Sequence, residues 1–130
     1  MLLPLATGRW QTAKKKGRKM KISVKDIVVI SENFEKLLKG LELMKGHEAC
    51  IFEALSKLAQ DNSEFFETMT SYADSTWGVF YKLYYWKEDD VIEKRSLEVL
   101  SERLKAYSEL LNKEGGRELL ELLLGCKVED

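Results

Sequence analysis

The chain has 130 residues, of which 45% are hydrophobic and 33% charged, and its net charge at pH 7 is −1. This length is typical of one domain, and the apolar content is sufficient for a hydrophobic core. No apolar run in the sequence approaches the roughly 18 residues that a membrane span requires. Two isolated cysteines, Cys50 and Cys126, lack the spacing of a disulfide framework or a zinc site and favour a reducing cytosol. Composition therefore predicts a cytoplasmic globular protein, and high Lys and Glu with little Gln or Asn leans towards a thermophile.

Positive charge is concentrated at the N-terminus. Residues 1–21 hold seven Lys or Arg residues and no acid, whereas the remaining 14 basic and 22 acidic residues give a net charge of −8. One interpretation is a basic arm over Lys14 to Lys21 that binds nucleic acid or anionic lipid through phosphate groups. The charge of the rest of the chain disfavours nucleic acid as a partner, because it repels phosphate.

Two other interpretations of this tail remain open. A targeting peptide is disfavoured because Met1 to Ala6 is too short for a secretory core and Pro4 interrupts an amphipathic helix. The favoured interpretation is that Met20 is the natural start, because the Lys-rich codons before it can form a purine-rich stretch like a ribosome-binding site. We therefore expect a basic tail over 1–21 with no assigned function and a single domain over 22–130.

The first predicted helix spans residues 24 to about 60. Ser23 followed by Asp26 indicates a helix cap, and apolar residues then recur every three or four positions. Glu48 is the one polar residue in this series, and Gly46 lies just before it. The pattern predicts either one unbroken helix or a helix that kinks near Gly46.

A second helix is predicted from about 63 to 87, and it contains nine of the thirteen aromatic residues. The simpler interpretation is that these rings fill the core. The functional interpretation is that Tyr81, Tyr85 and Trp86 anchor another protein, because Tyr and Trp dominate interface hot spots.

A third helix is predicted to begin at Asp89-Asp90, with Glu93 completing a cap, and to end at Gly115-Gly116. Residues 117–124 then form a short, strongly apolar helix. Eight residues do not form a stable helix in isolation, so this segment must dock on the bundle or on a second copy of it. We therefore add Leu119, Leu120 and Leu123 to the candidate interface.

Antiparallel packing of three long helices predicts one polar layer at mid-length. Helix register sets Glu48 beside the polar part of the second helix and one turn of the third. A buried Glu in such a layer serves either to fix register or to act as an acid or base in a small-ligand or enzymatic site. A third interpretation is that the helix register differs and Glu48 lies in solvent. The layer comprises His47, Glu48, Asp74, Ser75, Thr76 and Arg103.

The sequence holds no motif from which a reaction follows. His47 and Cys50 are one turn apart, but the paired Glu-x-x-His motifs of di-iron bundles are missing from the sequence, so we predict no metal, no cofactor and no catalytic residue. The fold class predicted is all-α, an elongated antiparallel bundle of three long amphipathic helices plus a short C-terminal one. The expected function is a non-enzymatic interaction or scaffold module, with a homodimer or another helical protein as partner.

Overall fold

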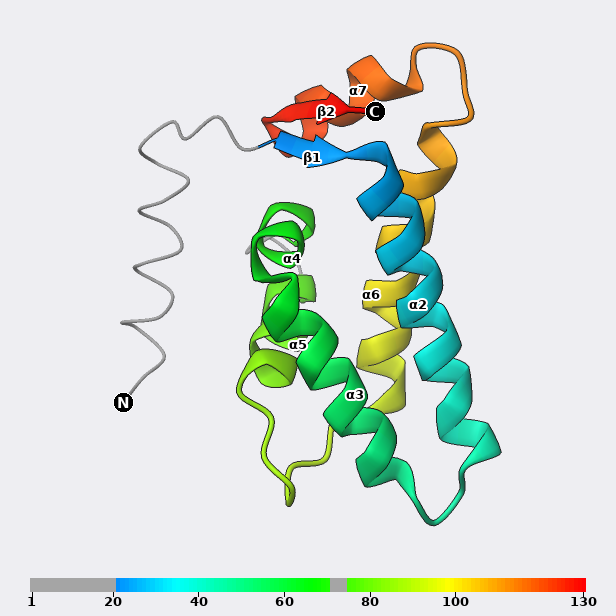
Figure 1. Cartoon of the computed structure of the whole chain (residues 1–130), viewed down its shortest axis with the longest axis vertical. Helices are drawn as coiled ribbons and strands as arrows, with labels where there is room; N and C mark the ends of the chain where they lie inside the picture. The colour runs from blue at the N-terminus through cyan, green and yellow to red at the C-terminus, as the bar shows by residue number, and fades with distance from the viewer. Residues whose placement is uncertain (1–20, 71–74) are drawn as a thin grey trace.

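The computed structural model describes residues 21–70 and 75–130. Within these ranges the chain forms six α-helices and one pair of short strands, so its class is all-α (Figure 1). The prediction of three long helices is not confirmed, because each predicted long helix is divided or shortened. The elements are β1 (Lys21–Ser23), α2 (Val24–Leu43), α3 (Glu48–Asp61), α4 (Ser63–Met69), α5 (Thr76–Tyr84), α6 (Lys94–Leu110), α7 (Gly116–Leu124) and β2 (Lys127–Glu129).

The first predicted helix is two helices joined by a reversal. The Ser23 hydroxyl accepts a hydrogen bond from the Asp26 N–H at 2.9 Å, so the predicted cap is confirmed. The α2 helix ends at Leu43, and Gly46 then adopts a φ of 88°, a left-handed conformation that favours glycine. An unbroken helix over 24–60 is therefore wrong, and α2 and α3 form the two arms of a helical hairpin (Figure 1).

The second and third predicted helices begin or end elsewhere than predicted. The α4 helix ends at Met69, where Thr70 turns to extended backbone, and α5 begins only at Thr76. Asp90 is not a helix cap, because its carboxylate accepts the Lys87 N–H at 2.8 Å and closes a turn before α6. Glu93 is the residue that precedes α6, which ends at Leu110, before the two glycines.

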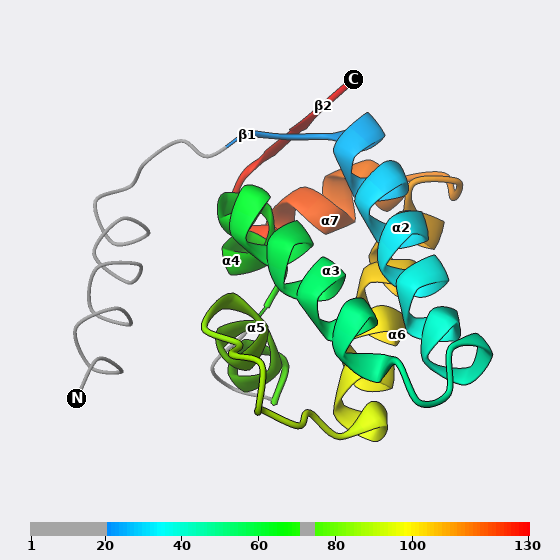
Figure 2. The same cartoon turned by 60° about the horizontal axis from the view of Figure 1, so that its bottom comes forward.

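The core lies where these helices meet. The α2 helix packs on α6 and on α3, and α5 packs on α3 and α6, so the four are grouped around a common interior (Figure 2). Phe34, Phe66 and Phe80 are fully buried at its centre. The Phe66 and Phe80 rings stack with centroids 5.7 Å apart, and Phe34 lies 6.1 Å from Phe66. Each buried ring contributes roughly 2–3 kcal/mol through apolar burial.

The two strands bring the start of the described chain beside its end (Figure 1). They pair in parallel, with Ile22 level with Val128, and both of these side chains are buried. The strand pair was not predicted. The predicted short C-terminal helix is confirmed as α7, and Gly115 precedes it with a φ of 74°.

No helix within residues 21–70 and 75–130 combines the length and the apolar content that crossing a membrane requires.

Candidate functional site

Glu48 is exposed at the start of α3, which corrects the prediction of a buried polar residue. Its carboxylate accepts the Gly46 N–H, at 3.1 Å from Oε1 and 3.2 Å from Oε2. Backbone N–H groups of Glu48 itself and of Gly46 lower the pKa of this carboxyl. A lowered pKa keeps the carboxyl ionised, whereas a general acid needs a raised one. Glu48 therefore acts as a cap of the turn.

The other members of the predicted polar layer occupy different environments. His47 is exposed in the turn before α3, Ser75 is exposed before α5, and Thr76 is fully buried at the start of α5. Arg103 is half-buried in α6, where its guanidinium lies 5.6 Å from the centre of the Tyr107 ring. Asp74 lies outside the described residues. The register that set Glu48 beside Ser75 assumed that the second helix continues from residue 63 to 87, and the end of α4 at Met69 removes that register.

Metal ligands do not cluster in the described part of the chain. No group of three or more His, Cys, Asp or Glu side chains is close enough there to hold an ion. Cys50 is exposed on α3.

The aromatic side chains of the candidate interface are half-buried along α5 and just after it. The Tyr81 and Tyr85 rings lie 4.7 Å apart, and the Trp86 ring lies 6.3 Å from Phe52. Trp86 also donates its indole N–H to the Asp90 carbonyl at 3.0 Å. One side of these rings thus covers the edge of the core and the loop before α6. The other side remains accessible to solvent.

The leucines of α7 divide between core and surface. Leu120 is fully buried, which corrects its assignment to the candidate interface. Leu119, Leu122 and Leu123 are 47%, 81% and 57% exposed. Spacings of three and four residues place these three on one side of the helix. We call this surface the leucine face.

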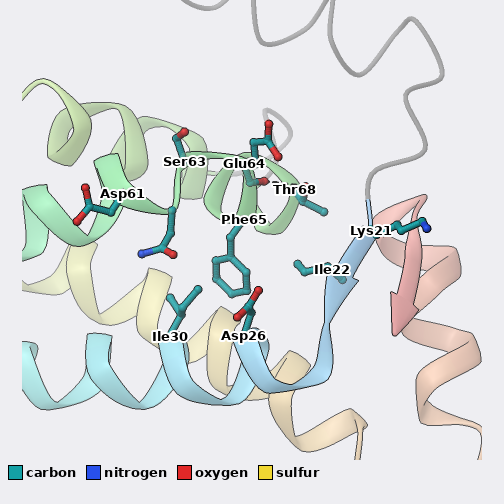
Figure 3. Close-up of a pocket in the computed structure, with 10 residues that line it drawn as sticks. Lys21, Ile22, Asp26, Ile30, Asp61, Ser63, Glu64, Phe65 and Thr68 are labelled. Carbon is teal, nitrogen blue, oxygen red and sulfur yellow. Dashed lines mark hydrogen bonds between the residues drawn. The ribbon is translucent and has the colours of Figure 1, made fainter. Parts of the chain in front are cut away.

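A concave feature, which the sequence did not reveal, lies between β1 and α4 (Figure 3). It has a volume of about 370 Å³, within the size range of ligand pockets. Phe65 from α4 and Asp26 from α2 point towards one another across it, and Ile22 of β1 points in from the side (Figure 3). We call this feature the strand-edge groove; its lining residues are Lys21, Ile22, Asp26, Ile30, Asp61, Asn62, Ser63, Glu64, Phe65 and Thr68.

The only sequence signal for this groove was a short alternation. Lys21-Ile22-Ser23 and Lys127-Val128-Glu129 both read polar, apolar, polar, which is the period of a half-buried strand. Three residues are too few to distinguish a strand from a helix start, so the pairing of the two segments was not predictable.

No family model, no curated protein and no solved structure matches this chain. Its function must therefore be argued from its own surfaces.

Proposed function

We propose that this chain is a non-enzymatic helical interaction module that self-associates through the leucine face of α7. The observation that carries the proposal is the contiguity of Leu119, Leu122 and Leu123, each about half exposed or more. Single exposed apolar residues are common on monomers, but contiguous ones mark contact surfaces.

A second copy is the partner that this face fits best. Two copies related by a two-fold axis present the same patch to each other, so leucine packs on leucine and no buried charge is left unpaired. The cytoplasmic location proposed from the number and spacing of the two cysteines is compatible with such an assembly.

The expected dimer is weak. A stable interface buries roughly 800 Å² on each partner, which is more than three leucine side chains expose. The leucine face is thus expected to drive a concentration-dependent equilibrium in the micromolar range, with the half-buried Tyr81, Tyr85 and Trp86 available as a second surface for another helical protein.

Sedimentation velocity on the full chain and two variants tests the proposal. The wild type is expected to shift from one chain of 15.0 kDa towards twice that mass as its concentration rises. Leu122→Lys should weaken this association at least about tenfold, because it places a charge in an apolar contact.

The matched control is Val91→Lys, because Val91 is 84% exposed in the loop before α6, similar to Leu122. This variant should associate like the wild type. Equal weakening by both substitutions, or a single-chain mass for the wild type at high micromolar concentration, would contradict the proposal.

A further inference from the structure

The strand-edge groove runs beside the open edge of the two-stranded sheet. The sheet contains only β1 and β2 within the described residues, so each strand has one neighbour. In Figures 1 and 3, β1 lies between β2 on one side and α4 on the other. Lys21 and Ile22 line the groove, whereas no residue of β2 does. The groove thus lies on the side of β1 that faces away from β2.

The outer edge of β2 is covered by a side chain. The Val128 N–H donates to Glu121 Oε2 of α7 at 2.9 Å. Backbone groups of successive strand residues turn to opposite edges, so Lys127 and Glu129 turn towards β1. An exposed strand edge is commonly blocked in this way against pairing with another chain.

Within residues 21–70 and 75–130, no side chain covers the outer edge of β1 in this way. Ile22 is level with Val128 and turns its backbone towards β2, so Lys21 on one side of it and Ser23 on the other turn theirs away from β2. The N–H and C=O of Lys21 and the N–H of Ser23 therefore face the groove side of the sheet. These are the main-chain groups that a third strand would bind.

The lining of the groove defines the chemistry of the added strand. Its apolar part is made by three buried side chains, Ile22, Ile30 and Phe65. Its charged part is mostly anionic, because Asp26, Asp61 and Glu64 are exposed lining residues, whereas the ammonium group of Lys21 lies 3.6 Å from the Glu129 carboxylate of β2. An occupant that alternates apolar with basic residues satisfies both parts at once, because side chains of a strand alternate between its two faces.

We infer that the strand-edge groove binds an extended, Lys/Arg-rich peptide segment of another protein, which pairs with β1 as a third strand. Main-chain hydrogen bonds to Lys21 and Ser23 supply affinity, and the carboxylates and the apolar residues select the side chains, as in other cases of strand addition. This site lies on β1, α2, the end of α3 and α4, so it does not depend on the leucine face of α7.

Fluorescence anisotropy with a labelled probe peptide tests the inference on the full chain. The probe is an acetylated heptapeptide that alternates Lys and Val, and it is expected to bind saturably at one site. The same peptide with Glu in place of Lys should not bind. Methylation of the backbone nitrogens at every second residue separates strand pairing from charge attraction, because a methyl group removes the donor. Two methylated peptides are compared, one methylated at the odd-numbered residues and one at the even-numbered residues. The peptide whose methylated N–H groups face β1 should bind at least tenfold more weakly, and the other should bind nearly as the unmethylated peptide does.

Protein variants locate the site. Asp61→Lys should weaken binding about fivefold, the scale of one exposed charge pair, and a lysine at the C-terminal end of α3 is compatible with the helix dipole. Glu53→Lys is the control, because Glu53 is also exposed on α3 but does not line the groove. Leu122→Lys should leave peptide binding unchanged, even where it abolishes self-association.

Three results would overturn the inference. If Asp61→Lys and Glu53→Lys weaken peptide binding equally, the peptide is held by diffuse charge attraction. The same conclusion follows if both methylated peptides bind equally well. Tighter binding of a free peptide of residues 9–19, with the same dependence on methylation, would make the occupant this chain's own basic segment and exclude another protein as its source.

Discussion

At the scale of the residue, Glu48 shows how one chain reversal changes the role of a side chain. As a buried member of the predicted polar layer, Glu48 would be costly to truncate and tolerant of replacement by leucine. As an exposed carboxylate bonded to the Gly46 N–H it stabilises only the turn and the start of α3.

We expect Glu48→Gln and Glu48→Leu both to lower the midpoint of thermal unfolding at neutral pH. The lowered pKa of Glu48 in the folded chain means that its stabilisation is complete above the ordinary value of 4.5 and is lost as pH falls through the folded pKa. The difference between wild type and Glu48→Gln should therefore close in acid. Thermal unfolding followed by circular dichroism from pH 7 to pH 3 measures this, with Glu53→Gln as an exposed control on the same helix. A more stable Glu48→Leu would indicate burial after all.

The two glycines at the start of α7, Gly115 and Gly116, are expected to differ in their tolerance of a side chain. A Cβ on Gly116 would lie 1.7 Å from the Leu110 carbonyl oxygen, which is backbone and cannot move aside without shifting the end of α6. Gly115 has open space but a φ of 74°. Gly116→Ala should therefore cost about 3 kcal/mol of unfolding free energy and Gly115→Ala about 1 kcal/mol. Urea denaturation of both variants measures the order, and the reverse order would refute this description of the α6–α7 junction.

At the scale of the element, the presence of the helices was easier to predict from the sequence than the residues at which they begin and end. Ser23, with Asp26 three residues on, located the start of α2 because a cap is a local interaction, and the density of leucines located α7. The division at Gly46 was not decided by the apolar period, because two helices that fold back on each other keep the same period as one long helix. A helical hairpin differs from one long helix in that its two arms pack on the same core. That packing depends on tertiary contacts, which the local sequence does not specify.

Glu121 joins α7 to β2 and is expected to hold the last strand in place. Glu121→Ala leaves the Val128 N–H without this acceptor and should cost about 1 kcal/mol of stability. Glu121→Gln keeps an acceptor oxygen and should restore most of the loss. Hydrogen exchange at the Val128 amide reports the effect directly: faster exchange is expected in the Ala variant than in the Gln variant. Identical exchange in both would exclude Glu121 as the group that covers this strand edge.

At the scale of the whole molecule, the all-α class and the buried rings followed from composition and period, whereas the two candidate surfaces did not. The leucine face was predicted in part, with Leu119 and Leu123 exposed and Leu120 buried. Which leucines are exposed depends on which side of α7 meets the core, and the sequence of nine residues does not specify that side. The strand-edge groove combines residues of β1 and α2 with the α3–α4 corner, and no local pattern encodes such a meeting.

Residues 1–19 are expected to be dispensable for folding. They precede β1, and their charge run supplies no apolar period for a core. A chain that begins at Met20 should keep a cooperative thermal transition with a midpoint close to that of the full chain, because β1 and its pairing with β2 remain intact. Scanning calorimetry on both chains is the comparison, and loss of the cooperative transition in the shorter chain would assign the tail a structural role.

The central claim, that the leucine face joins two copies, is tested most directly by methyl NMR spectra of the full chain over a dilution series. The methyl signals of Leu119, Leu122 and Leu123 should shift with concentration and fit a single dimerisation constant. The methyl signals of Leu43 and Val91, each 84% exposed on other surfaces, should remain fixed. Shifts confined to Leu43 and Val91, or no shift in any methyl signal up to high micromolar concentration, would contradict the account.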